Sequence, residues 1–137
     1  MPNPLPPNLS ALEARLGIPS GTLDAEDTAR AGAALEDATT LILAEVPASV
    51  ASAWESDAPK VAVLIALKAA RREFENPRGL QTEAMGDHSI GLTDTSGVYL
   101  TAREIAQIHR VATGRRGGFV GSVRTPSAYY DEREDTA

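Results

Sequence analysis

The stretch that decides the fold runs from Pro59 to Gly79, with the sequence PKVAVLIALKAARREFENPRG. Its first half, Val61 to Leu67, carries only apolar residues, so we expect a helix that other elements cover on all sides. Its second half mixes Phe74 with charged residues and should keep one face in water. The predicted core residues of this central helix are Val61, Leu64, Ile65, Leu67 and Phe74.

Both ends of the central helix carry sequence signals. Pro59 suits the first helical turn, where its missing N–H has no partner to lose, and Ser56 or Asp57 can cap that turn. The pair Asn76-Pro77 predicts the end of the helix, because proline disfavours α geometry in the residue before it.

The composition of the whole chain narrows the fold and the function. A length of 137 residues fits one domain, and a core of small aliphatic residues with few aromatics favours packed helices over a β-sandwich. We therefore predict a mainly α fold of about four helices around the central one. The absence of cysteine excludes disulfides, and the net charge of −6 argues against a dedicated nucleic-acid binder. With no signal peptide and no run of membrane-spanning length, we expect a soluble protein.

The chain before the central helix predicts an arm, two helices and a connector. Residues 1–8 hold four prolines and predict an extended arm that becomes fixed only where it lies on something. A short helix should begin at Ser10, in a capping box with Glu13, and end at Gly17; a longer amphipathic helix should open at Thr22 or Asp24 and end near Glu45. Residues 47–57 are predicted as an irregular connector, with Trp54 as a core plug.

The chain after the central helix predicts a hairpin, a helix and a tail. Residues 80–92 alternate around Gly86-Asp87 and predict a short β-hairpin that must pack on the helices or on another chain. Thr101 and Glu104 form a capping box that opens a helix ending at Gly114. A helical domain would then span 9–113. Residues 114–137 would be an extended docking tail, because they lack a sustained hydrophobic period yet hold half of the aromatics.

No arrangement of reactive residues predicts catalysis. His88 and His109 are the only histidines, so with no cysteine we predict no metal site and no cofactor. Four acidic residues of the second helix could act as paired carboxylates, but a solvated helix face is favoured because it explains them without a pocket. These residues are Asp24, Asp27, Glu36 and Asp37.

Four stretches, in order and spacing, resemble the head–tail connector (adaptor) proteins of long-tailed bacteriophages, especially those of actinobacterial phages. They are LEARLG at 12–17, ARAGAALEDATTLILA at 29–44, ENPRGLQTEAMGDHSIGL at 75–92 and GVYLTAREIAQIHR at 97–110. In that family an N-P-x-G-[hydrophobic]-x-[ST]-E stretch links the core helix to the hairpin; here it reads Asn76, Pro77, Gly79, Leu80, Thr82 and Glu83. Gly91 departs from the family, where a β-branched residue is usual.

The resemblance implies a non-enzymatic virion protein of the head–tail neck, assembled in the cytoplasm of the bacterial host. It would form a homo-oligomeric ring, expected to be twelve-fold to match the capsid portal. Its partners would be other copies of itself, the portal protein, a downstream head–tail stopper or neck protein, and genome DNA passing through the lumen by transient, non-specific contact. A small helical DNA-binding regulator stays as the alternative, although the helix from Thr101 to Thr113 offers few basic residues.

Two sets of residues are predicted to form the contacts of such a ring. The candidate subunit interface is the hairpin, through Leu80, Thr82, Met85, Ile90 and Leu92. The candidate portal-docking residues lie in the tail, where arginines would meet acidic groups and apolar side chains would anchor the segment. They are Arg115, Arg116, Phe119, Val120, Val123, Arg124, Tyr129 and Tyr130.

Overall fold

The computed structural model of the chain describes residues 1–77 and 97–114, and these residues form five helices. The helices are α1 (Leu9–Leu16), α2 (Ala25–Ala44), α3 (Ala48–Ser56), α4 (Lys60–Glu75) and α5 (Ala102–Thr113). The predicted mainly α class is confirmed for this part of the chain, with five helices rather than about four. The predicted hairpin at 80–92 and the tail beyond Gly114 lie outside the described residues.

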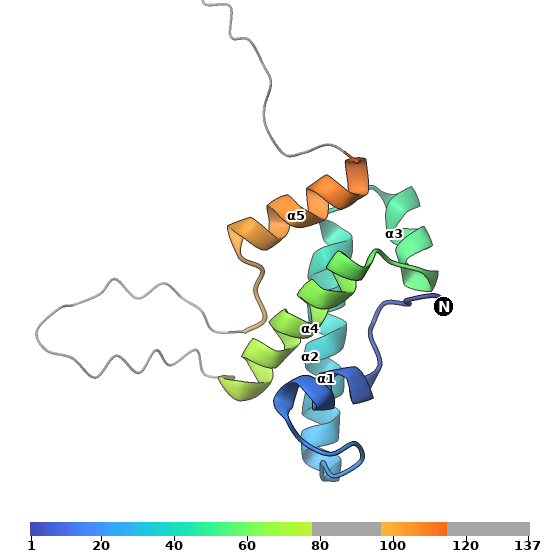
Figure 1. Cartoon of the computed structure of the whole chain (residues 1–137). Coiled ribbons are helices and arrows are strands. Elements are labelled where there is room, and N and C mark those ends of the chain that lie inside the picture. Colours follow the sequence, from blue (N-terminus) through green and yellow to red (C-terminus); the bar gives the residue numbers. More distant parts are fainter. Residues whose placement is uncertain (78–96, 115–137) are drawn as a thin grey trace, which may run out of the picture.

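Helices α2 and α4 cross at the centre of the fold, and the other helices pack around this pair (Figure 1). Helix α4 contacts α1, α2 and α5, while α3 contacts α2. In Figure 1, α5 lies across one end of the crossing, and the N-terminal arm leads from the end of α3 to the beginning of α1. Helices α2 and α4 are therefore the two elements that the other helices pack against, and the sequence predicts the central place of α4.

Two hydrophobic clusters make up the core, and α4 contributes to both. The first cluster contains Leu5, Ile42, Trp54, Ala58, Ala62, Ile65, Ala66 and Ile108. The second cluster contains Leu12, Ala31, Ala34, Leu35, Ala38, Leu67, Ala69 and Ala70. The predicted burial of Ile65, Leu67 and Trp54 is confirmed, since each is at most 6% exposed.

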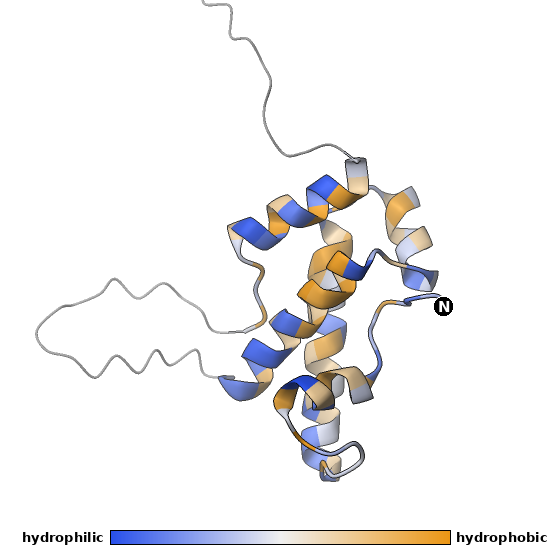
Figure 2. Cartoon of the chain, in the orientation of Figure 1, coloured by the Kyte–Doolittle hydropathy of each residue, from blue (hydrophilic) through white to orange (hydrophobic). Residues whose placement is uncertain are grey.

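The prediction that Leu64 belongs to the core is wrong. Its side chain is 44% exposed, and it lies between Lys60 and Lys68 on the outward side of α4. An α-helix places residues four apart on one face, so these three residues form one stripe. The apolar run from Val61 to Leu67 is therefore not covered all round. Figure 2 shows the hydrophobic first half of α4 and its hydrophilic second half.

The predicted edges of the core are also less buried than expected. Val61 and Phe74 are half-buried, each packing against one of the two clusters. Both lie on the flanks of α4, where its buried side meets the solvent. The apolar composition of this helix predicted complete coverage, but the described residues leave the side that carries Lys60, Leu64 and Lys68 exposed.

The ends of α2, α4 and α5 follow their sequence signals. Asp24 caps α2 by accepting a hydrogen bond from the Asp27 N–H at 2.7 Å, and α4 ends before Asn76 as predicted. The capping box of Thr101 and Glu104 is confirmed in both directions. Gly114 closes α5 with a φ of +68°, a conformation that glycine adopts without strain.

Other predicted caps are wrong because their side chains bind elsewhere. Helix α1 begins at Leu9, after Asn8 rather than Ser10, although Gly17 ends it as predicted. The Glu13 carboxylate turns to the following loop, where it accepts hydrogen bonds from Ser20 Oγ at 3.1 Å and from the Gly21 N–H at 3.2 Å. This buried glutamate therefore fixes the α1–α2 loop instead of capping its own helix.

The N-terminal arm and the connector are more ordered than the sequence predicts. The Asn3 N–H donates to Asp57 Oδ1 at 2.9 Å, and the Ala58 N–H donates to the Asn3 carbonyl at 2.7 Å. Leu5 is 4% exposed and belongs to the first cluster. Asp57 thus holds the arm rather than capping α4, where Pro59 takes the N-cap position. The predicted connector is helix α3, which Trp54 attaches to the core.

Candidate functional site

The residues predicted to form the subunit interface and the portal contact lie outside the described residues. This applies to the hairpin residues between Leu80 and Leu92 and to the tail residues between Arg115 and Tyr130. The candidate site is therefore sought among the surfaces that residues 1–77 and 97–114 form.

The candidate catalytic and metal-ligating residues do not converge in this part of the chain. Asp24 is the cap of α2, and Asp27 forms an ion pair with Arg30 at 2.7 Å. Glu36 and Asp37 are exposed on α2, as expected for a solvated helix face. No group of three potential metal ligands occurs within residues 1–77 and 97–114. Across the same residues, none of the helices combines the length and apolar character that a membrane span requires.

A polar bridge joins the end of α4 to the beginning of α5. The Arg72 guanidinium donates two hydrogen bonds to the Glu104 carboxylate, at 2.7 and 2.9 Å, and a third to the Tyr99 carbonyl at 2.9 Å. It also lies over the Tyr99 ring, 4.8 Å from the centroid. Such a bidentate pair is among the stronger polar contacts in proteins. It therefore fixes the beginning of α5 against the end of α4.

Glu104 is ionised in this bridge. Burial alone would raise the pKa of its carboxyl, but the hydrogen bonds from Arg72 and from the Thr101 N–H outweigh that effect. The charges of Arg72 and Lys68 act in the same direction, so the pKa lies below the ordinary value of a glutamate. Glu104 is thus an anion with a structural role.

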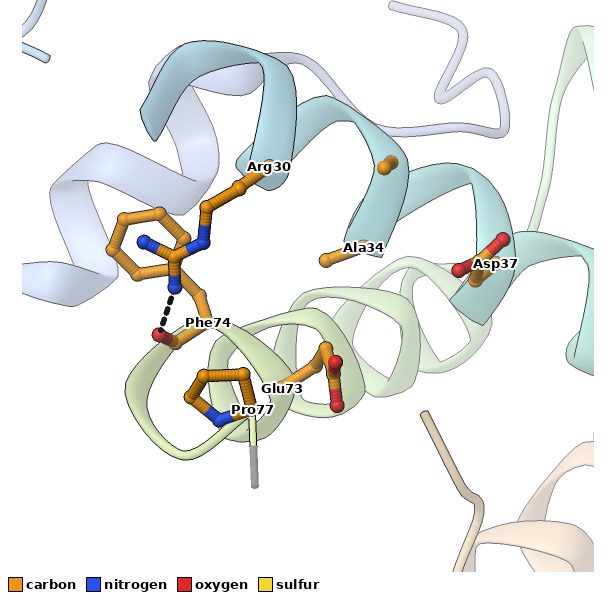
Figure 3. Close-up of a pocket in the computed structure, with 7 residues that line it drawn as sticks. Arg30, Ala34, Asp37, Glu73, Phe74 and Pro77 are labelled. Atoms are coloured by element: carbon orange, nitrogen blue, oxygen red, sulfur yellow. Dashed lines mark hydrogen bonds between the residues drawn. The ribbon is translucent and has the colours of Figure 1, made fainter. Parts of the chain in front are cut away.

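A small pocket lies where α2 meets the end of α4 (Figure 3). The Arg30 guanidinium lies over the Phe74 ring, 4.8 Å from its centroid, and donates to the Phe74 carbonyl at 3.1 Å. Asp37 and Glu73 line the other side. Its volume of about 160 Å³ is below the roughly 300 Å³ at which small-molecule sites begin, so we assign it a bracing role.

A more apolar groove lies between the second half of α2, residues 98–100 and the beginning of α5. Its volume is about 290 Å³, and its lining residues are Leu41, Ala44, Glu45, Val98, Tyr99, Leu100 and Ile105. Leu41 and Ile105 are half-buried and belong to neither core cluster. An open apolar groove of this kind is typical of a surface that another protein segment covers.

Glu45 marks the edge of the groove. Its Oε2 lies 2.9 Å from Nε2 of His109, and its side chain is 34% exposed. Within the described residues, no other ion pair involves this carboxylate. His109 is exposed on α5, as the sequence predicts.

The second candidate surface is the outward side of α4. Lys60, Leu64, Lys68, Arg71 and Glu75 are all exposed and recur every three or four residues. Arg71 pairs with Glu75 at 3.0 Å, whereas neither lysine has an ion-pair partner within 4.0 Å among the residues that the structure describes. This outward stripe is therefore a basic surface with a leucine at its centre, on a chain of net negative charge.

Comparison of the chain with protein-family models, with curated protein sequences and with solved structures gave no match. The assignment of a function therefore depends on the residues and surfaces described above.

Sequence reasoning missed both surfaces. The groove combines residues from α2 and α5 that are about sixty positions apart, so no local pattern indicates it. The stripe had a signal: Lys60 and Lys68 stand one turn before and one turn after Leu64, and a lysine on each side of an apolar residue at that spacing indicates an exposed face.

Proposed function

We propose that this protein is a head–tail connector of a long-tailed bacteriophage, a non-enzymatic ring that joins the capsid portal to the tail. Genome DNA would pass through the lumen of the ring. The ring would be assembled in the bacterial cytoplasm and retained in the virion neck, between the portal and a downstream stopper or neck protein.

One observation carries the proposal, namely the order and spacing of the four stretches that resemble this family. A short LEARLG segment precedes an alanine-rich helix, an apolar helix ends at Asn76-Pro77, and a capped helix begins after Thr101. The helix order in the described residues is compatible with this resemblance, but helical packing of this kind serves many functions.

Self-association is supported by the surfaces. Leu64 and Tyr99 are exposed large hydrophobic residues, and they lie on the outward stripe and in the groove, respectively. A ring requires a heterologous contact, in which one patch of each copy meets a different patch of the next. The hairpin at 80–92 and the tail at 114–137 would add contacts to a neighbouring copy and to the portal.

The DNA-binding alternative has less support. A recognition helix needs basic side chains on its exposed face, whereas α5 offers only Arg103 and Arg110 there and holds the buried Glu104 in its first turn. The basic stripe of α4 contains two lysines and one arginine, and that arginine is paired with Glu75. We therefore favour an acidic protein surface as the partner of this stripe.

The proposal is tested with the purified full-length protein, alone and mixed with the portal protein encoded by the same genome. Native mass spectrometry and negative-stain imaging should show a closed ring with a central lumen that co-purifies with the portal. A protein that stays monomeric in both samples would contradict the proposal. Retention of duplex DNA on filters at low salt by the monomer would support the regulator instead.

The tail has its own test. Truncation after Gly114 should leave the helical circular dichroism spectrum unchanged and abolish co-purification with the portal, because the aromatic and arginine side chains of 115–137 would be lost. Deletion of 80–92 should leave a helical protein that no longer forms rings. Rings that form without 80–92 would remove the hairpin from the subunit interface.

A further inference from the structure

Two separate surfaces of this fold are complementary in charge and in the spacing of their residues. On α4, Leu64 stands out between Lys60 and Lys68. On α2, Leu41 and Glu45 line the groove, and Glu45 also contacts His109. Asp37 is exposed one turn before Leu41, outside the groove lining, so a carboxylate stands four residues from Leu41 on each side. At a rise of 1.5 Å per residue, the two charges of each set are about 12 Å apart along the helix.

The charges of the two surfaces are opposite. Each lysine of α4 lies one turn from Leu64, and each carboxylate of α2 lies one turn from Leu41. Two helices that lie side by side with the leucines in contact would bring each lysine near one carboxylate. The charges pair whether α4 and α2 lie parallel or antiparallel, because each set of charges is symmetric about its leucine.

The same molecule cannot make this contact with itself. Leu64 lies on the side of α4 that faces away from the core, and among residues 1–77 and 97–114 the groove is lined by α2, residues 98–100 and α5, not by α4. The two surfaces therefore belong to different faces of one copy. A contact between them needs a second copy. In such a pair, the groove of one copy and the Leu64 surface of the other stay free to bind further copies.

We propose that Leu64 of one copy inserts into the groove at Leu41 of the next copy, with Lys60 and Lys68 against Asp37 and Glu45. This inference rests on the proposed function for the need of a repeated contact, and it names the two surfaces that form it. Because the contact is heterologous, it repeats from copy to copy and closes into a ring where the rotation between copies allows it.

Disulfide crosslinking tests the contact, and only the introduced cysteines can react because the natural sequence has none. Full-length Leu64→Cys and full-length Leu41→Cys are purified separately, mixed, and oxidised with copper–phenanthroline. A disulfide needs Cβ atoms about 4 Å apart, so a covalent dimer should form rapidly in the mixture. A matched mixture of Leu64→Cys with Ala14→Cys, exposed on α1, is the control. Equal yields in both mixtures would overturn the proposal.

Sedimentation velocity tests the energetics of the contact. Leu64→Asp should weaken self-association by about thirtyfold or more, the loss expected at an interface hot spot. Leu64→Met should assemble like the natural protein, since it conserves volume and apolar character. Because Leu64 is exposed, both variants should keep the helical circular dichroism spectrum of the natural protein.

A charge swap gives a readout that loss of folding cannot imitate. Lys60→Glu with Lys68→Glu should weaken self-association, and mixing this variant with one carrying Asp37→Lys and Glu45→Lys should restore it. Arg15→Glu, an exposed reversal on α1, should have no effect. Failure of the mixed variants to associate better than either one alone counts against the pairing.

The outcomes separate this contact from the proposed function. Rings that form with Leu64→Asp as readily as with the natural protein would overturn the contact and leave the connector function in place; residues 78–96 or the tail would then be the occupant of the groove. A specific crosslink in assemblies that never close into rings would support the contact and contradict the connector function.

Discussion

The two core clusters share α4 but are built from different side chains. The first holds Trp54, Leu5 and three isoleucines, and it gathers the N-terminal arm, α3 and α5 around one end of α4. The second contains five alanines among its eight buried residues, and it lies where α1, α2 and α4 meet. Large side chains bridge distant elements in the first cluster, whereas small ones let helices approach closely in the second. The first should therefore be sensitive to lost volume and the second to added volume.

The largest expected effect is that of Trp54→Ala in the first cluster. Trp54 is 6% exposed and is the buried residue of α3, so its removal leaves a cavity and detaches that helix. We expect the free energy of unfolding to fall by about 3–5 kcal/mol. Urea unfolding followed by circular dichroism measures this loss. Trp54→Phe is the matched control and should lose less, and a loss below about 1 kcal/mol for Trp54→Ala would show that α3 is not held by this side chain.

A smaller effect is expected from Ala38→Leu in the second cluster. Ala38 is fully buried on α2, so three added carbon atoms must push α2 away from its neighbours. We expect a loss of about 1–3 kcal/mol in the free energy of unfolding. Ala29→Leu, on the exposed side of α2, is the control and should change little. If Ala38→Leu proves as stable as its control, the second cluster has room that the first lacks.

The smallest effect should come from the polar bridge beside Leu100, a residue that packs against both clusters. Glu104→Gln removes the charge that Arg72 binds and should cost about 1 kcal/mol at pH 7, between the values for exposed and buried pairs. Arg72 is 30% exposed, which keeps the cost modest.

The pH dependence of this bridge has a defined sign. Because the pKa of Glu104 is lowered in the folded state, its contribution is present above the pKa of the unfolded chain, about 4.3, and is lost as the pH falls further. The stability difference between the natural protein and Glu104→Gln should therefore shrink between pH 5 and pH 3. Unfolding midpoints at both pH values measure it, and a constant difference would assign the effect to packing rather than charge.

Local signals predicted four of the five helices of the described residues and missed α3. Asp24, Thr101 and Gly114 act within one turn of their own helix, so the sequence around them was enough to place α2 and α5. Glu13 looked like a capping residue, but the α1–α2 loop folds over it and competes for its carboxylate. A one-dimensional pattern contains no information about such competition.

The candidate site was harder to predict than the fold. Burial of Ile65 follows from the apolar run around it, whereas exposure of Leu64 depends on how many helices surround α4. The groove needs the return of the chain at Val98 to lie beside Leu41, more than fifty residues earlier. The apolar composition of a segment assigns all of its residues to the core. The packing of the other helices then determines which of these residues are buried and which stay exposed.

The bridge between Arg72 and Tyr99 has a consequence for the length of chain between α4 and α5. One side chain holds the residues just before Pro77 to the residues just after Gly97, so the two ends of the intervening stretch are kept near each other by contacts that lie outside it. For a chain segment whose ends are already fixed, a doubling in length costs only about 0.6 kcal/mol in closure entropy. Insertions of an epitope or a reporter between 78 and 96 should therefore leave the five-helix fold intact. The same tolerance would let evolution vary the length and sequence of this stretch independently of the helices that carry it.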